Sequence, residues 1–128
     1  MKLEDISGTY AEAGTWHGTD GKSGSLSGRV TVTHGPAGLS FRYGDGETQS
    51  SEPFLAGAKH AALRGEASSG TLYFGQDSLI LEYAADVRGR KEQNTDVWIF
   101  RDGVAHRTGV IRQAGRVIWF DVVMSRVD

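Results

Sequence analysis

Three polar residues near the end of the chain have the types and spacing of a small acid–base site. His106, Thr108 and Asp121 fall on alternate positions of two apolar segments, so they share one face if both segments are strands. A carboxylate close to an imidazole fixes its tautomer and raises its basicity, as in a general acid–base pair. The alternative is a polar cluster that satisfies itself within an interface or a barrel wall. No serine or cysteine is identifiably placed as a nucleophile beside this pair.

Arg107 is a second candidate, because its own face is otherwise apolar. Four large apolar residues share this face with it: Trp98, Phe100, Phe120 and Met124. A guanidinium in an apolar surround is unfavourable unless it is paired. It could therefore anchor the carboxylate of an apolar ligand in an otherwise apolar pocket. Two alternatives stay open, namely pairing with a structural carboxylate such as Glu82 or Asp96, and extension of the side chain to a polar rim.

The elements that must position these residues are three antiparallel strands between Asn94 and Val127. Asp102-Gly103 favours a type I′ hairpin turn, which needs positive φ at both central residues. Ala114-Gly115 is a weaker signal, since only its glycine takes positive φ freely. The register that follows pairs Arg101 with Val104, Ile99 with His106, Val97 with Thr108, Gln113 with Arg116, Ile111 with Ile118, Gly109 with Phe120, Asp121 with Thr108 and Arg107 with Val122.

Both faces of these strands are rich in apolar residues, whereas a single sheet over a core shows one polar face. The Trp98 face comprises Trp98, Phe100, Ala105, Arg107, Gly109, Ile111, Ile118, Phe120, Val122 and Met124. The Trp119 face comprises Val97, Ile99, His106, Thr108, Val110, Val117, Trp119, Asp121 and Val123. We expect one face to line a barrel or sandwich interior and the other to be covered by protein, and we predict a homodimer.

The rest of the chain reads as short strands separated by turns. Eighteen glycines against two prolines, with β-branched and aromatic residues in short runs, indicate an all-β protein. Ser25–His34 alternates apolar and polar residues as a half-exposed strand does. Ser68-Ser69-Gly70 is typical of a turn, and residues 48–58 favour an edge strand or an irregular connection. We predict a single domain over residues 1–128, an antiparallel up-and-down meander of about 8–10 strands closed into a lipocalin-like barrel.

Composition excludes several classes of function. The formal net charge of −2 offers no electrostatic footprint for nucleic acid. The absence of cysteine excludes disulfides and thiolate metal sites, and the four histidines show no metal-ligand spacing, so we expect neither metal nor cofactor. The N-terminus lacks the apolar core of a signal peptide. No run approaches the roughly 20 apolar residues of a membrane span, so we expect a cytoplasmic protein without a membrane partner.

Gly14-Thr15-Trp16 near the start of the chain and Arg126 near its end resemble the pattern of the calycins, the lipocalin-like, fatty-acid-binding and avidin-like barrels. In that superfamily a tryptophan of the first strand packs under a basic residue of the last strand, because a guanidinium stacks on an indole face. The resemblance therefore implies that Trp16 packs under Arg126. Gly24-Ser25-Leu26-Ser27-Gly28 also looks like an avidin segment. The loop at 18–24 leaves no room for the helical pair of fatty-acid-binding proteins, and the further tryptophans of the biotin pocket are missing. The resemblance implies a fold and transfers no ligand.

These observations favour a binding module that holds a small apolar or amphipathic ligand in a barrel lumen. The predicted ligand-binding residues are Arg107, Trp98, Phe100, Phe120, Met124, His106 and Asp121. One alternative is a small barrel enzyme, an isomerase, cyclase or hydrolase that uses His106 with Asp121. The other is a structural homo-oligomeric domain, in which the second apolar face is a subunit interface.

Overall fold

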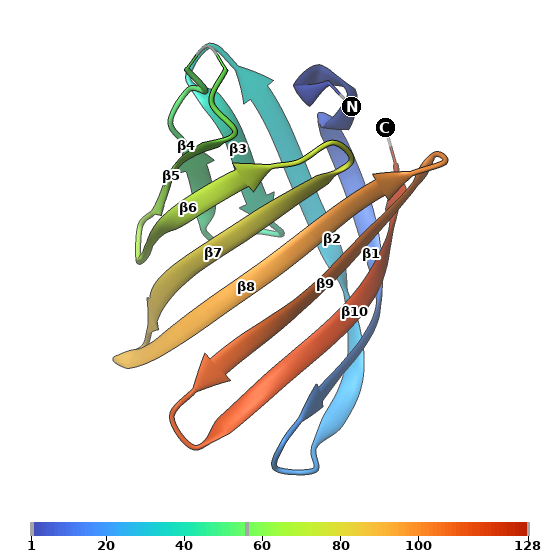
Figure 1. The fold of residues 1–128 in the computed structure, drawn as a ribbon. Helices are drawn as coiled ribbons and strands as arrows, with labels where there is room; N and C mark the ends of the chain where they lie inside the picture. The colour runs from blue at the N-terminus through green and yellow to red at the C-terminus, as the bar shows by residue number, and fades with distance from the viewer. Residues whose placement is uncertain (1, 56, 128) are drawn as a thin grey trace.

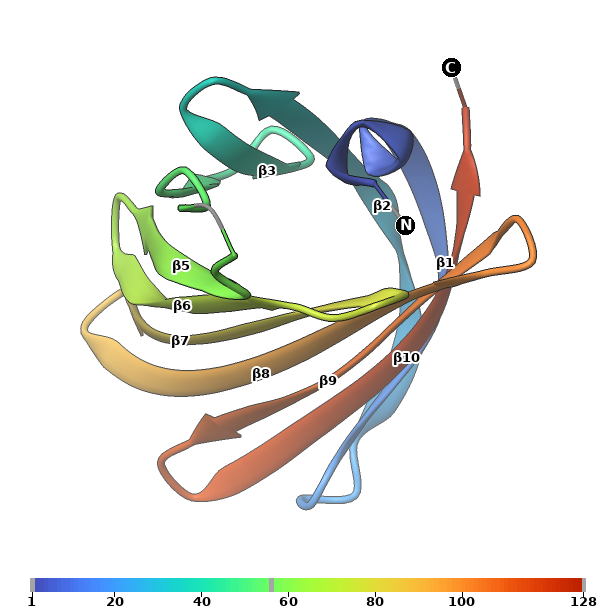
Figure 2. The same cartoon turned by 45° about the horizontal axis from the view of Figure 1, so that its top comes forward.

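A closed antiparallel β-barrel makes up most of residues 2–55 and 57–127, which a computed structural model describes (Figures 1 and 2). Each strand pairs with its neighbours in sequence, and β1 pairs with β10 to close the ring. The elements are η1 (Leu3–Ile6), β1 (Gly8–Gly18), β2 (Ser23–Gly35), β3 (Gly38–Tyr43), β4 (Thr48–Ser51), β5 (His60–Gly65), β6 (Ser68–Phe74), β7 (Ser78–Val87), β8 (Arg90–Arg101), β9 (Val104–Gln113) and β10 (Arg116–Arg126). The predicted all-β, up-and-down barrel is confirmed.

The register predicted for the last three strands is confirmed pair by pair. Ile99 faces His106 between β8 and β9, and Thr108 faces Asp121 between β9 and β10. Asp102 and Gly103 take φ of +53° and +73°, the double positive φ of a type I′ turn. Because side chains alternate along a strand, this register sends the whole Trp98 face into the barrel and the whole Trp119 face outward.

One end of the barrel is capped and packed. The short helix η1 buries Ile6 there, and the Tyr10 hydroxyl donates to the Ile6 carbonyl at 2.7 Å. Arg126 donates to the Tyr10 hydroxyl at 2.8 Å and to the Asp5 carbonyl at 2.7 Å, with its guanidinium 5.3 Å from the Tyr10 ring centre. Among the described residues, no helix has the length and apolar character needed to cross a membrane.

The contact implied by the calycin resemblance, Trp16 under Arg126, is not formed. On β1, Arg126 of β10 pairs with Tyr10, whereas Trp16 pairs with Phe120, six residues farther along the strand. At about 3.3 Å per residue, the two positions are roughly 20 Å apart. Tyr10 therefore takes the place that the resemblance assigns to the tryptophan, and Trp16 lies toward the other end of the barrel.

The core fills the half of the barrel nearest η1. Trp98 is fully buried and its ring meets Phe41 edge-on, with 5.3 Å between ring centres. Side chains from almost every strand surround this pair: Tyr10, Val30, Val32, Leu39, Leu63, Leu72, Leu79, Leu81, Ala105 and Met124. Edge-to-face contact of this kind adds to the stabilisation from burial alone. This half of the lumen is therefore occupied by the protein's own side chains.

The prediction of a turn at Ser68-Ser69-Gly70 is wrong, because these residues begin β6 and the bend lies just before them. Gly70 pairs with Tyr83 of β7, and a Cβ at position 70 would lie 2.7 Å from the Tyr83 Cβ. Gly70 therefore allows β6 and β7 to approach each other closely, and it does not mark a change of chain direction. In the stretch 48–58, β4 is a short strand followed by irregular chain, and residue 56 lies outside the described residues.

The strands differ in length, and this leaves the second half of the barrel open on one side. β3 pairs with β2 only from Val30 to Gly35. The first half of β2, Ser23–Arg29, is held by β1 alone, apart from one backbone bond from the Gly44 amide to the Arg29 carbonyl. The edge of this half-strand on the β3 side is therefore not paired with another strand.

Candidate functional site

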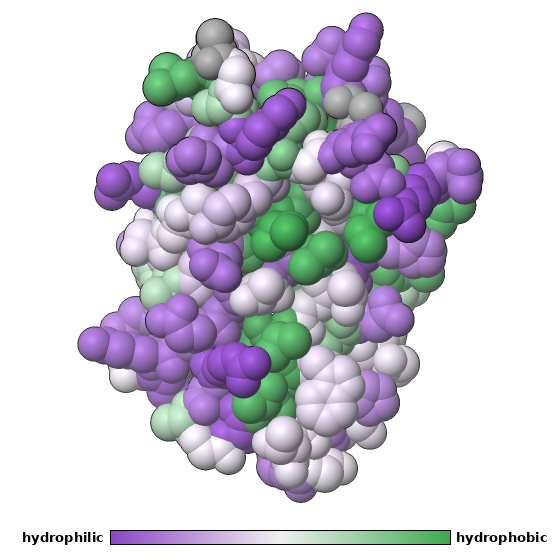
Figure 3. Space-filling model, viewed as in Figure 1, coloured by the Kyte–Doolittle hydropathy of each residue, from purple (hydrophilic) through white to green (hydrophobic). Residues whose placement is uncertain are grey.

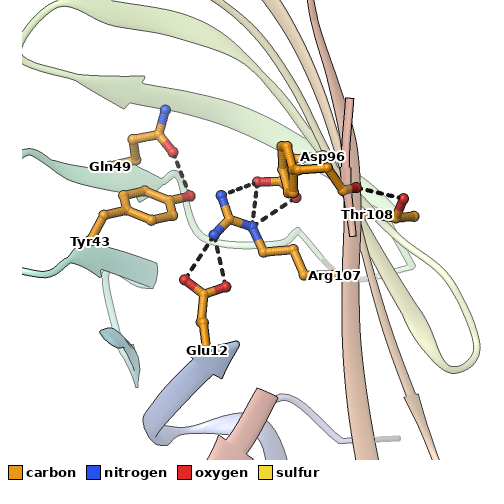
Figure 4. A network of polar contacts seen from close by, with 7 residues as sticks. Glu12, Tyr43, Gln49, Asp96, Arg107 and Thr108 are labelled. Atoms are coloured by element: carbon orange, nitrogen blue, oxygen red, sulfur yellow. Dashed lines mark hydrogen bonds and ion pairs between the residues drawn. The ribbon is translucent and has the colours of Figure 1, made fainter. Parts of the chain in front are cut away.

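A charged layer crosses the lumen where the packed core ends (Figure 4). Arg107 of β9 extends inward between Asp96 of β8 and Glu12 of β1. Its Nε donates to both Asp96 carboxylate oxygens at 2.9 and 2.8 Å, and its Nη1 donates to both Glu12 oxygens at 3.1 and 2.9 Å. Nη2 lies 2.8 Å from Asp96 Oδ2. Each carboxylate is thus bound through two oxygens, the strong form of a charge-assisted contact.

Aromatic rings enclose the same guanidinium. Its central carbon lies 5.1 Å from the ring centres of Tyr43 and Phe120 and 5.3 Å from that of Trp98. Gly109 makes room for the Phe120 ring, because a Cβ there would lie 2.6 Å from the ring's Cζ. The side chains of Arg107, Glu12 and Asp96 are 12%, 6% and 3% exposed. The layer is therefore nearly dry, which strengthens its electrostatic interactions.

One positive charge faces two negative ones in this layer, and the pKa directions of its groups reflect burial first and these charges second. Burial raises the pKa of the Asp96 carboxyl above its ordinary value, against the opposing effect of Arg107. Burial and then Asp96 raise the pKa of Tyr83 to about 12, and the same causes raise the pKa of Tyr43. Burial alone would lower the pKa of Arg107, but Asp96 outweighs it and the net change is upward. Arg107 stays charged, and both tyrosines keep their protons at neutral pH.

We expect the wild type to lose stability relative to Asp96→Asn as the pH rises above the unfolded-state pKa of Asp96. A carboxyl whose folded-state pKa is raised stabilises the fold fully below the unfolded pKa, near 3.8, and loses that contribution as the pH rises through the folded pKa. Urea unfolding of both proteins across this window measures the difference. The free energy of unfolding of the wild type should fall with rising pH relative to that of the variant. Parallel curves would contradict the prediction.

A chain of hydrogen bonds holds Tyr43 in place beside the charged layer. Its hydroxyl donates to Gln49 Oε1 at 2.9 Å, Gln49 Nε2 donates to Ser68 Oγ at 3.1 Å, and Ser68 Oγ donates to Glu47 Oε1 at 3.2 Å. Gln49 and Ser68 are buried. Because the Tyr43 hydroxyl donates its hydrogen to Gln49, the lone pairs of its oxygen remain available as acceptors.

A pocket of about 430 Å³ lies against the charged layer, on the side away from the core. Its lining comes from the free half of β2, the end of β3, and β1, β7 and β9: Glu12, Leu26, Ser27, Gly28, Arg29, Tyr43, Gly44, Tyr83 and Arg107. Farther toward this end, apolar side chains of the inner face stay partly exposed, namely Trp16, Leu26, Ile111 and Ile118. Beyond them a polar rim follows, in which Arg116 bonds to Gln113 and Asp20.

The structure divides the predicted site residues among four places. Arg107 lines the pocket, and Phe120 packs on its guanidinium. Trp98 lies in the core, while Phe100 and Met124 line a separate depression near η1, at the capped end. Two residues point outward into solvent: His106 and Asp121. The sequence therefore identified the Trp98 face as a possible lining of the lumen, but it did not show which part of that face is packed in the core and which part borders the pocket.

The polar trio of the Trp119 face is not joined as an acid–base pair. His106 pairs with Val123, two residues from Asp121 along β10, and no hydrogen bond joins the His106 and Asp121 side chains in the part of the chain that the structure describes. Thr108 donates instead to the Phe120 carbonyl at 3.0 Å. Within residues 2–55 and 57–127, no three His, Asp or Glu side chains gather as metal ligands would.

The outer face of β7 to β10 carries apolar side chains that this chain does not cover. Trp119 and Val123 are each 45% exposed, and Figure 3 shows hydrophobic areas over these strands with hydrophilic residues around them. The homodimer stays a prediction. If a second copy covers this face, Trp119→Lys should convert a dimer to a folded monomer in sedimentation velocity at micromolar concentration. A wild type that sediments as a monomer would contradict it.

Sequence reasoning missed Glu12, Tyr43, Tyr83 and Gln49 as members of the site. For Glu12 a signal was present, because it falls in the same alternation as Tyr10, Gly14 and Trp16 of β1. A glutamate between inward-facing aromatic positions predicts a buried carboxylate that needs a cation. Tyr43 and Tyr83 share the inward alternation of their strands but gave no sign of lying next to Arg107.

Comparison with known proteins identified no relative of this chain. Neither the scan of protein-family models nor the searches of curated proteins and of solved structures found a match to the chain.

Proposed function

We propose that this protein is a binding module that holds a small amphipathic ligand in the open half of its barrel. The observation that carries the proposal is the pocket of about 430 Å³, which ends on the charged layer of Glu12, Asp96 and Arg107. Its size falls within the range of small-molecule sites, and its lining combines aromatic rings with a few fixed polar groups. Arg107 contributes the floor of this site.

The unequal lengths of the strands support the same proposal. A barrel built only for stability would fill its lumen with side chains along its whole length. Here the core stops at Trp98 and Phe41, and the next inward-facing position of β2 after Val30 is Gly28, where a large side chain could fill the space. A Cβ at Gly28 would meet nothing within 4 Å. The open half is thus shaped to receive a group from outside.

The catalytic alternative gains no support from the placement of its residues. His106 and Asp121 are exposed on the outer face, whereas the pocket lies inside the barrel. An acid–base pair must lie within hydrogen-bond reach of the bound group whose proton it moves. The structural, homo-oligomeric alternative concerns the outer face and is compatible with a ligand in the lumen.

The binding of Nile red, an uncharged fluorescent dye, tests the proposal. The wild type should bind one dye molecule with enhanced emission, and Gly28→Leu should abolish that binding by filling the pocket. Gly35→Leu is the matched control, because Gly35 lies at the other end of β2 and its Cβ would also meet nothing within 4 Å. Failure of the wild type to bind, or equal binding by the Gly28 and Gly35 variants, would overturn the proposal.

A further inference from the structure

We propose that the head group of the ligand is a cation, an alkylammonium or related amine, seated in this pocket between Glu12 and the tyrosine rings. This inference rests on the proposed function and names the class of molecule that the pocket would take. It stands on the charge of the buried layer, the free acceptors in the lining, and the aromatic character of the walls.

The first argument is the occupancy of Arg107. Its Nε and Nη2 contact Asp96, and its Nη1 contacts both oxygens of Glu12. A guanidinium offers five N–H donors, and two bidentate carboxylates take up most of them. An anionic head group would have to displace one of these carboxylates and leave it buried without a partner, which is strongly unfavourable.

The second argument is the surplus of negative charge. Glu12 lines the pocket, and its side chain is only 6% exposed, so its charge is poorly screened by water. A carboxylate has about four acceptor positions, of which Arg107 uses two. Burial is the main cause of the raised pKa of Asp96, the other acid of the layer, and the charge of Glu12 adds to it. A cation beside Glu12 would balance the layer and fill the unused acceptor positions.

The third argument is the nature of the walls. Tyr43 and Tyr83 both line the pocket, and the negative faces of aromatic rings attract cations. The Tyr43 oxygen, whose proton goes to Gln49, can accept a hydrogen bond from an ammonium group. Arg29 is the opposing charge in the lining, but its side chain is exposed and screened by solvent.

Three ligands with the same alkyl chain and different head groups test this inference: dodecylamine, dodecanoate and dodecanol. Each competes with bound Nile red near pH 7, where the amine is protonated and the acid is ionised. The amine should displace the dye at a concentration about tenfold or more below that of the acid, as expected for one charge-assisted contact. Glu12→Gln should remove this preference while dye binding persists, because the Arg107–Asp96 pair stays intact.

Glu82→Gln is the control, since it removes the same charge from the outer surface of β7, next to Tyr83, and should keep the preference. If Nile red binds but the amine shows no advantage over the acid, the inference is wrong and the binding module stands. Tighter binding of dodecanoate would overturn it in favour of Arg107 as a carboxylate anchor. If no dye binds, the proposed function itself fails.

Discussion

Arg107→Met should lower the free energy of unfolding by about 3–5 kcal/mol, the range measured when one partner of a buried ion pair is removed. The substitution leaves the carboxylates of Glu12 and Asp96 buried on either side of an apolar side chain, with no cation between them. Both acids can escape this state by taking up protons or by opening the barrel. Urea unfolding followed by circular dichroism measures the loss.

Neutralising the whole layer provides the control for this prediction. The triple variant Glu12→Met, Asp96→Leu, Arg107→Met removes all three charges together and should recover most of the lost stability. Replacement of a complete buried ion network by apolar residues of similar volume is often neutral or stabilising. An Arg107→Met protein within about 1 kcal/mol of the wild type would show that water reaches the layer and that its charges are not buried in solution.

Gly14→Ala should destabilise the barrel by about 1–3 kcal/mol, the usual effect of inserting a methyl group into a tightly packed site. A Cβ at position 14 would overlap the Asp121 carbonyl oxygen and lie 2.7 Å from the Cα of Val122. Both are backbone atoms of β10, so the clash can be relieved only by moving one strand away from the other. Thermal and urea unfolding measure the effect.

Gly28→Ala is the matched control for Gly14→Ala. Gly28 faces Glu12 on the neighbouring strand, and its Cβ would meet nothing within 4 Å. It should leave stability unchanged or raise it slightly, because alanine restricts the unfolded chain more than glycine does. Equal losses from the two substitutions would mean that strand propensity, and not the close approach of β1 and β10, determines the effect.

The last three strands could be predicted in detail because their information is local. Asp102-Gly103 and Gly115 specify where the chain reverses, and the alternation of side chains then assigns every residue to a face. The same logic failed at Ser68–Gly70. There a serine- and glycine-rich stretch looked like a turn, whereas the glycine is needed for contact with Tyr83 across a strand pair.

The charged layer could be predicted only in part. Glu82 and Asp96 were the candidate partners of Arg107, and Asp96 is the one in contact, whereas Glu82 is exposed on β7. Glu12 lies 95 residues from Arg107 in sequence, and the two meet because β1 pairs with β10 and Val122 faces both Gly14 and Arg107. That closing register is not marked by any turn, so no local pattern reveals it.

The way the ring closes has a consequence for folding kinetics. Every strand pairing except β1–β10 joins segments consecutive in sequence, so those hairpins can form one after another. The pairing of β1 with β10 must bring together residues as distant as Tyr10 and Arg126. The entropic cost of closing this long loop is smallest once the intervening strands are already ordered. We therefore expect closure to follow the rate-limiting transition state. Weakening this seam should then accelerate unfolding while leaving the folding rate nearly unchanged.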